Sequence, residues 1–313
     1  MTKRILISGS SGQVGSCLVE HFSKKYEVIG LDIKKSGIPA VDRITTLGDI
    51  RNKDIVNNLV KKVDTVIHTA AQLSIPVSIE NPVFDAEINV MGTLNLLNAT
   101  KSNTELSRFI YVSTSAVYGE SKYLPIDEKH PLNPMSPYGL SKLTAENYCM
   151  LFHKIYGLPV VCIRPFNIYG DRENPKKPYS SIIARFNDMV SNNKKITIYG
   201  DGKQLRDFIH SKDIVSFIDL LLEKPEATGE VYNVASGKPT TIIEIVKLIL
   251  KENKKNIEEN IQYKRSEKGK IKDIYGDVKK SRKIGFKPKI TLEEGIKEVV
   301  ESIKKNNKQR LKE

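Results

Sequence analysis

The sequence predicts an α/β fold built on a doubly wound parallel sheet, with a smaller C-terminal domain interleaved with the first. Two observations lead to this prediction. Short runs rich in Val and Ile alternate with helical patterns over the first half of the chain, as expected of parallel strands joined by right-handed crossovers. These runs are continuously apolar instead of alternating with polar residues, which is typical of strands buried on both faces.

The expected elements follow in a regular order as far as residue 167 and then change rhythm. Strands are predicted at residues 4–8, 27–32, 64–68, 108–113, 159–164 and 231–234, with helices at residues 13–24, 53–60, 85–100 and 138–156. Later helices are predicted at 179–192, 212–223 and 241–251 and from Leu292, with a strand at 195–199. We expect one domain at 1–170 plus about 208–236, and a second at about 171–207 and 237–313.

Composition excludes several classes of protein. The 313 residues carry a net charge of +13, but the lysines are dispersed, which favours a solvated surface over a nucleic-acid site. No apolar run reaches the ~18 residues of a membrane span, and the N-terminus lacks a signal-peptide pattern. Cys17, Cys149 and Cys162 are far apart and are expected to be reduced. We therefore expect a cytoplasmic protein that binds neither membranes, nucleic acid nor metal.

A glycine-rich segment follows the first predicted strand and begins the first predicted helix. It reads Gly9-Ser10-Ser11-Gly12-Gln13-Val14-Gly15, and Asp32 ends the second predicted strand. Glycines permit a tight turn and close approach to a pyrophosphate, while a helix N-terminus offers free N–H groups. A carboxylate such as Asp32 can accept hydrogen bonds from ribose hydroxyls and would repel a 2′-phosphate. The pattern predicts a Rossmann-type site for NAD. Lys34 and Lys35 follow Asp32 closely and could reduce the preference for NAD over NADP.

Tyr138 and Lys142 are four residues apart and would share one face of a helix. A nearby ammonium lowers the pKa of a phenol, which can then act as a general base. The same spacing also occurs at Tyr118/Lys122, Tyr199/Lys203 and Tyr275/Lys279. The Tyr138 pair differs because Ser136 and Pro137 form a helix-start signal and a long helical pattern follows. It also follows a strand that ends in hydroxyl-bearing residues at the sheet edge where ligands bind.

With these segments in view, the chain resembles the extended short-chain dehydrogenase/reductases, specifically the NAD-dependent nucleotide-sugar epimerase/dehydratase family. The resemblance covers nearly the whole chain. It rests on Gly9 to Gly15, Asp32, Gly48-Asp49-Ile50, His68-Thr69-Ala70-Ala71-Gln72, Ser113 to Gly119, Tyr138 to Lys142, Arg164-Pro165-Phe166-Asn167-Ile168-Tyr169-Gly170, residues 200–208, and Tyr232-Asn233-Val234-Ala235-Ser236-Gly237.

The resemblance implies a role for each matching residue. Thr114 would hydrogen-bond the sugar hydroxyl, Tyr138 would take its proton and Lys142 would hold the nicotinamide ribose. Further contacts to NAD are implied for Asp49, Ile50, Ala70, Ala71, Ser113 and Pro165, in addition to the glycine-rich segment and Asp32. Contacts to the substrate are implied for Gln72, Asn167, Arg206 and Arg265. A surface salt bridge is the alternative for Arg206, and Lys268 is the alternative to Arg265 as phosphate ligand.

Ala116 narrows the implied reaction. Relatives that dehydrate or decarboxylate the sugar typically carry an acid two residues after the catalytic Thr or Ser, and alanine cannot donate a proton. The resemblance therefore implies a 4-epimerase, with UDP-glucose and UDP-galactose as the first choice of substrates and a homodimer formed through residues 85–100 and 138–156. A nucleotide-sugar reductase or dehydrogenase, and an inactive nucleotide- or RNA-binding relative, are the alternatives.

Overall fold

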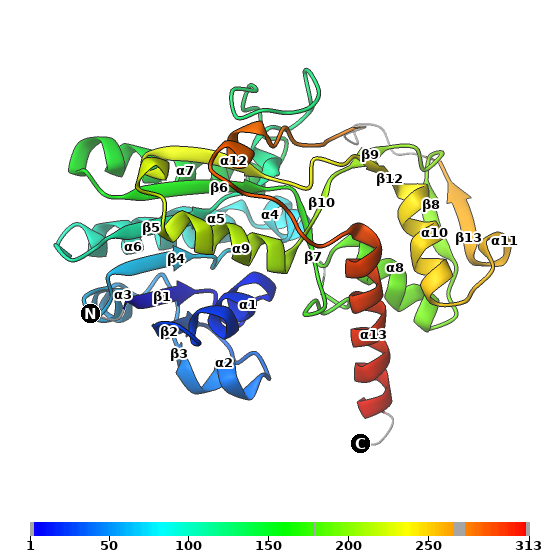
Figure 1. The fold of residues 1–313 in the computed structure, drawn as a ribbon, viewed down its shortest axis with the longest axis horizontal. Coiled ribbons are helices and arrows are strands. Elements are labelled where there is room, and N and C mark those ends of the chain that lie inside the picture. The colour runs from blue at the N-terminus through cyan, green and yellow to red at the C-terminus, as the bar shows by residue number, and fades with distance from the viewer. Residues whose placement is uncertain (1–2, 178, 266–272, 311–313) are drawn as a thin grey trace.

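A seven-stranded parallel sheet forms the centre of the larger part of the protein (Figure 1). The structure, a computed structural model, describes residues 3–177, 179–265 and 273–310. The strand order is β11-β6-β5-β4-β1-β2-β3, and every pair in it is parallel. The strands are β1 (Arg4–Ser8), β2 (Glu27–Asp32), β3 (Thr45–Leu47), β4 (Thr65–His68), β5 (Arg108–Val112), β6 (Val160–Pro165) and β11 (Glu230–Val234). This architecture confirms the predicted fold class.

Helices cover both faces of the sheet. On β1, Ile5 and Ile7 pack in one hydrophobic cluster and Leu6 in the other, since successive side chains of a strand point to opposite faces. The first cluster includes residues of α1 (Gln13–Phe22) and α9 (Ser211–Leu222). The second includes residues of α3 (Lys53–Val60), α6 (Gly92–Thr100) and α7 (Pro137–Tyr156). Burial on both faces explains the continuously apolar strands.

The segment predicted as one helix over residues 85–100 is helical throughout but changes its hydrogen-bonding pattern twice. It contains the end of α5 (Pro82–Ala86), a π-helical segment η1 (Glu87–Met91), and α6. The short helix α4 (Ile75–Glu80) precedes them and was not predicted. Ser74 caps α4 and Asn81 caps α5, each accepting a backbone N–H with its side chain. Helical backbone therefore runs without a break over residues 85–100, as predicted, and the π-helical segment within it packs against α7, which carries Tyr138.

A third hydrophobic cluster lies apart from the sheet (Figure 1). It joins α8 (Ile182–Ser191), α10 (Ile242–Glu252), α13 (Leu292–Arg310) and β8 (Ile196–Tyr199), and β8 pairs with β13 (Ile261–Lys264). Two short strand pairs lie between the clusters: β7 (Asn167–Tyr169) with β10 (Phe208–His210), and β9 (Leu205–Arg206) with β12 (Thr240–Thr241). The remaining elements are α2 (Pro39–Ile44), η2 (Ser115–Val117), η3 (Pro225–Ala227), α11 (Ile257–Asn260) and α12 (Lys279–Lys283). We retain the predicted domain division as a proposal.

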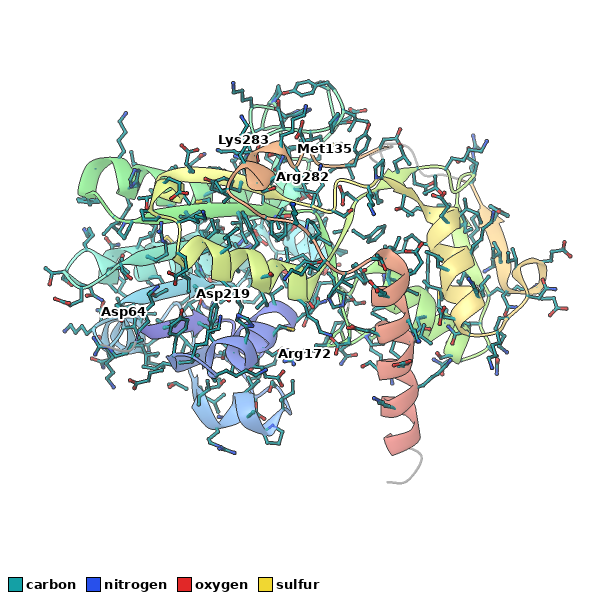
Figure 2. The ribbon with its side chains drawn as sticks, in the orientation of Figure 1. Asp64, Met135, Arg172, Asp219, Arg282 and Lys283 are labelled. Carbon is teal, nitrogen blue, oxygen red and sulfur yellow. The ribbon has the colours of Figure 1, made fainter. Side chains whose placement is uncertain are left out.

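Ion pairs fix helix α1, which follows the glycine-rich segment. Arg172, in the loop after β7, contacts Glu20, and Asp219 of α9 lies 2.7 Å from His21 Nε2 (Figure 2). Helix α1 is therefore tied both to the loop after β7 and to a second helix on the same face of the sheet. Within the described ranges, every helix is too short or too polar to cross a lipid bilayer.

Candidate active site

The glycine-rich segment forms a cradle between β1 and α1. Gly9 has a φ of 77°, and a Cβ added to it would lie 2.6 Å from the backbone nitrogen of Ala70, at the end of neighbouring strand β4. A Cβ on Gly15 would lie 1.9 Å from the carbonyl oxygen of Gly9. Side chains at either position are therefore excluded. Gly12 precedes α1 without a side-chain cap, so N–H groups of the first turn can meet an anionic ligand.

Asp32 lies at the carboxyl end of β2, directly beside this cradle. Its Oδ2 accepts the N–H of Ser11 at 3.0 Å, and its Oδ1 accepts the N–H of Lys34 at 3.2 Å. The Lys35 ammonium donates instead to the carbonyl oxygen of Thr45 at 2.8 Å and to that of Asp42. Lys35 is therefore bound to backbone carbonyls, and the Asp32 carboxylate stays available to a ribose hydroxyl.

The predicted adenine-side residues lie on the loop after β3. Arg51 Nη2 is 2.7 Å from Asp49 Oδ2, and this guanidinium lowers the pKa of the Asp49 carboxyl. Ile50 is buried against Gly92, where an added Cβ would lie 2.4 Å from the Ile50 side chain. Ala70 lies two residues after the end of β4, so the two strands that flank the topological switch point, β1 and β4, both end at this cradle.

The predicted base, Tyr138, lies in the first turn of α7. Ser136 caps this helix by accepting the N–H of Gly139 at 3.1 Å, as the sequence predicted, and Pro137 begins it. Tyr138 is buried, and its phenol lies near the side chain of Thr114. Burial raises the pKa of Tyr138 to about 12, and the Thr114 side chain opposes this shift. The phenol and the threonine hydroxyl therefore lie together at the end of β5.

Lys142 lies one helical turn further along α7. Its Nζ donates to the carbonyl oxygen of Val112 at 2.8 Å and lies 4.3 Å from the centre of the Tyr111 ring. Burial lowers the pKa of Lys142 to about 8. The neighbouring Ser113 and Pro165 are buried at the ends of β5 and β6, and the Ser113 hydroxyl has no hydrogen-bond partner among the described residues. The predicted catalytic and nicotinamide-side residues thus meet at one edge of the sheet.

The other Tyr-x-x-x-Lys pairs occupy different settings. Tyr118 is buried, and its hydroxyl donates to Asn233 Oδ1 at 2.6 Å and accepts from Arg164 Nη1 at 2.9 Å. Tyr199 ends β8 and is 40% exposed, and Tyr275 lies outside the named helices and strands. Helix α7 therefore distinguishes the Tyr138 pair from the pairs that share its spacing.

A pocket beside the cradle contains the predicted substrate residue Asn167. Gln13, Glu173, Arg185 and Phe208 are among the residues that line it. Gln13 Nε2 lies 3.1 Å from Glu173 Oε1, and burial raises the pKa of Glu173 to about 7. Glu173 and Arg185 were not predicted as site residues, because no motif marks either of them, although Arg185 lies in a helix that was predicted. The pocket therefore brings together polar side chains from α1, β7 and α8.

The remaining predicted substrate residues lie outside the lining of this pocket. Arg206, on β9, donates through Nη1 to the carbonyl oxygen of Leu205 at 2.7 Å. Gln72 uses both ends of its amide within the protein: Nε2 donates to Asp85 and Ser74, and Oε1 accepts the N–H of Ser74. Arg265 is exposed at the end of β13. Lys268, its alternative, lies outside the described residues.

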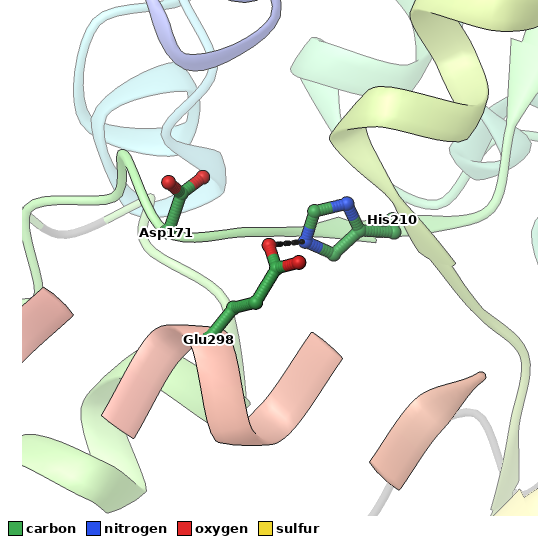
Figure 3. A group of neighbouring side chains, drawn as sticks. All are labelled: Asp171, His210 and Glu298. Atoms are coloured by element: carbon green, nitrogen blue, oxygen red, sulfur yellow. Dashed lines mark ion pairs between the residues drawn. The ribbon is translucent and has the colours of Figure 1, made fainter. Parts of the chain in front are cut away.

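A second polar cluster, Asp171, His210 and Glu298, has spacing that could hold a metal ion (Figure 3). Their ligand atoms lie within 4.8 Å of one another. However, His210 Nδ1 accepts the N–H of Lys212 at 3.3 Å, so the proton of the neutral ring is on Nε2, which faces Glu298 at 3.6 Å. Lys212 Nζ also lies 2.6 Å from Glu298 Oε2. The cluster therefore fits a set of polar contacts that link α13 to the end of β10 better than it fits a metal centre.

Comparison with protein families agrees with this geometry. The family model described as GDP-mannose 4,6 dehydratase matches residues 6–299. The chain belongs to the NAD-dependent nucleotide-sugar epimerase/dehydratase family. This confirms the family that the sequence motifs predicted.

Relatives in this family differ in reaction. A Methanocaldococcus jannaschii protein named "Putative UDP-glucose 4-epimerase" is 38% identical, and the match covers 97% of this chain and 99% of the relative. The mouse dTDP-D-glucose 4,6-dehydratase is 32% identical, with 97% of this chain and 89% of the relative covered. Family membership therefore leaves both epimerisation and dehydration open.

Solved structures show the same fold. The Thermotoga maritima UDP-glucose 4-epimerase, solved with UDP-glucose, superposes with a TM-score of 0.90 at 30% identity, covering 97% of this chain and 99% of that chain. The Thermus thermophilus UDP-glucose 4-epimerase, solved with NAD, superposes with a TM-score of 0.86 at 29% identity, covering 96% and 99%. These matches extend over the sheet and over the third hydrophobic cluster.

Proposed function

We propose that this protein is an NAD-dependent 4-epimerase of a nucleotide sugar, with UDP-glucose and UDP-galactose as the first candidate pair. Two features carry the proposal: the Tyr138 phenol lies near Thr114, one helical turn from Lys142 on α7, and alanine occupies position 116. The first feature provides proton transfer at a sugar hydroxyl. The second removes the acid that relatives use to eliminate water.

The cradle fits NAD. Gly9 and Gly15 leave room where a Cβ would clash, α1 presents an uncapped N-terminus, and Asp32 offers carboxylate oxygens at the end of β2. We infer that this segment holds the pyrophosphate, that Asp32 binds the adenosine ribose, and that Lys142 binds the nicotinamide ribose. Bound NAD supplies the hydride acceptor for oxidation at C4 and the hydride donor for the return step.

The proton steps fall to Tyr138 and Thr114. Thr114 orients the C4 hydroxyl, and Tyr138 takes the hydroxyl proton as C4 is oxidised. Tyr138 returns the proton to the same oxygen when the 4-keto sugar is reduced on its other face. Lys142 lies one helical turn away on α7, and its ammonium is proposed to favour the phenolate when the cradle is occupied. Asn167 and Arg206 are proposed to hold the nucleotide diphosphate, with Arg265 as a further candidate.

Ala116 supports epimerisation over dehydration. It lies in the turn η2, and its N–H donates to Thr114 Oγ1 at 3.2 Å. Its backbone is therefore held next to the proposed catalytic hydroxyl, and its side chain is a methyl group. Elimination of water from C5 and C6 requires a proton donor at this point, and a methyl group cannot serve. The 4-keto sugar would then be reduced again within the same turnover.

The function is tested by incubating the NAD-loaded protein with a panel of UDP-sugars and identifying products by NMR. We expect interconversion of two C4 epimers, approached from either sugar, with no net change in nicotinamide absorbance. Stoichiometric change in that absorbance would instead establish a reductase or dehydrogenase, and a 4-keto-6-deoxy product would establish a dehydratase. Either result would contradict the proposal.

Tyr138→Phe tests the assignment of the base. We expect turnover to fall by about a hundredfold or more while NAD still binds, because the variant keeps the ring and loses the proton acceptor. Tyr156→Phe is the matched control, since Tyr156 is an exposed tyrosine on the same helix. Near-normal turnover in the Tyr138 variant would exclude it as the base.

Asp32→Asn tests the nucleotide site. We expect NAD affinity, measured by calorimetric titration, to fall by about tenfold, because a charged hydrogen bond to the ribose is lost. The preference for NAD over NADP should also narrow. Asp42→Asn serves as control, because Asp42 is a nearby carboxylate that binds Ser36. Unchanged affinity in the Asp32 variant would refute the ribose contact.

We also propose a homodimer. Exposed apolar side chains occur on α5 and η1 (Val83, Phe84, Met91) and on α7 (Leu140, Leu151, Ile155), helices that pack against one another. Apolar surface on neighbouring helices is typical of a subunit interface. Analytical ultracentrifugation should give twice the chain mass, and Ile155→Glu should shift the protein to monomer. A monomer in the unmodified protein would contradict this assignment.

A further inference from the structure

A buried carboxylate lies beneath the catalytic helix. Asp85, on α5, is fully buried. Its Oδ1 accepts hydrogen bonds from Gln72 Nε2 at 2.7 Å and Asn89 Nδ2 at 3.2 Å, and its Oδ2 accepts one from Ser141 Oγ. Ser141 lies between Tyr138 and Lys142 on α7. Asp85 is therefore one hydrogen bond away from the helical turn that carries the catalytic pair.

The Asp85 carboxylate is surrounded by groups that can donate hydrogen bonds. The Ser141 hydroxyl accepts from Asn89 Nδ2 at 3.0 Å, and its own possible acceptors are Asp85 Oδ2 and, at 3.0 Å, the carbonyl oxygen of Tyr138. The ion pairs formed among the described residues do not include Asp85. A buried charge without a salt bridge is costly unless hydrogen bonds compensate for lost hydration. The presence of a buried carboxylate here, despite this cost, suggests that it has a role in the nearby active site.

The π-helical segment brings Asn89 into this network. The Asn89 amide donates to the carbonyl oxygen of Gln72 at 3.1 Å, and its Oδ1 accepts the Gln72 N–H at 2.8 Å. Gln72 directly follows the Ala70-Ala71 segment at the proposed cofactor site. π-Helical turns are rare and often occur at functional sites. Here the turn lets one asparagine contact the loop after β4, Asp85 and α7 together.

We propose that Asp85 is a positioning residue for the reaction of Tyr138 and Lys142. Through Ser141 it fixes α7 relative to the loop after β4, and its negative charge acts on both catalytic side chains. The proposal rests on the proposed function insofar as that function makes Tyr138 the base. The geometric part, which joins α7 to the cofactor loop, stands on the contacts alone.

The charge of Asp85 affects the two catalytic groups in the same direction. Burial is the largest cause of the raised pKa of Tyr138, and Asp85 adds to it. Burial lowers the pKa of Lys142, and Asp85 is among the groups that oppose this shift. Other titratable groups also face this region from the neighbouring strands and from α7 itself. They are Tyr111 on β5, His68 on β4, Cys162 on β6, and Glu146 and Cys149 on α7. The carboxylates Glu80 on α4 and Glu87 on η1 are exposed to solvent. Removing the Asp85 charge should therefore lower both pKa values.

The test is Asp85→Asn in the NAD-loaded protein. Tyrosine labelled with ¹³C at Cζ allows the titration of Tyr138 to be followed by NMR, with Tyr138→Phe identifying its signal. We expect the pKa of Tyr138 to fall by about half a unit or more, since a neighbouring negative charge is lost. The acid limb of the pH–kcat profile should move to lower pH, and kcat should fall about tenfold through loss of alignment.

Two further variants separate charge from position. Ser141→Ala keeps the carboxylate and removes its link to α7, so kcat should fall about tenfold without the shift in the pKa of Tyr138. Asp213→Asn removes another buried carboxylate, one that binds the N–H groups of Lys289 and Ile290, and should leave both quantities unchanged. If Asp85→Asn does not fold, Ser141→Ala still decides the positioning role.

The proposal is overturned if Asp85→Asn leaves the pKa of Tyr138 unmoved, or if a folded Ser141→Ala turns over like the unmodified protein. Failure of the proposed function would look different: no UDP-sugar would be epimerised by the unmodified protein. In that case the NMR titration of Tyr138, which needs no substrate, still tests the effect of Asp85.

Discussion

The contact between Lys142 Nζ and the carbonyl oxygen of Val112 places a cation at the carboxyl end of a central strand. The contact requires α7 to begin at this edge of the sheet and to lie over it. Buried polar contacts along α7 hold it there: Ser141 binds Asp85, Lys142 binds Val112, and Glu146 Oε2 lies 3.1 Å from Arg164 Nε on β6. Because such groups are costly to leave unpaired, these contacts also specify the register of α7 on the sheet.

Burial alone opposes the chemistry that we propose. It raises the pKa of Tyr138 to about 12 and lowers that of Lys142 to about 8, so it favours the neutral form of each. Below pH 8 the pair is therefore a phenol and mainly an ammonium. The chain's own groups leave Tyr138 protonated, so its proton-accepting form depends on further positive charge at the site. Such dependence would couple proton transfer to occupancy of the nucleotide cradle.

The sequence predicted most of the sheet and the position of Tyr138 and Lys142 at its carboxyl edge, since both follow from local signals. Strands buried on both faces must be continuously apolar, and β1 and β2 begin and end where predicted. Strand β3 was missed because it has three residues, two of them exposed. The π-helical turn was missed because its apolar spacing continues that of α6. The side-chain hydrogen bonds of Asn89 within this turn are made with residues distant in sequence, Gln72 and Ser141. Glu173 and Asp85 were missed for the same reason: their partners, Gln13 and Ser141, are far away in sequence.

The central claim is that hydrogen removed from C4 returns to C4 within one turnover. The most direct measurement uses a UDP-sugar that carries deuterium at C4, converted by the NAD-loaded protein in ordinary water. Mass spectrometry and NMR of the epimeric product locate the label. The account predicts that the product retains deuterium at C4 and that the hydrogen at C5 does not exchange. Loss of the label to the medium, or exchange at C5 with loss of water, would contradict it.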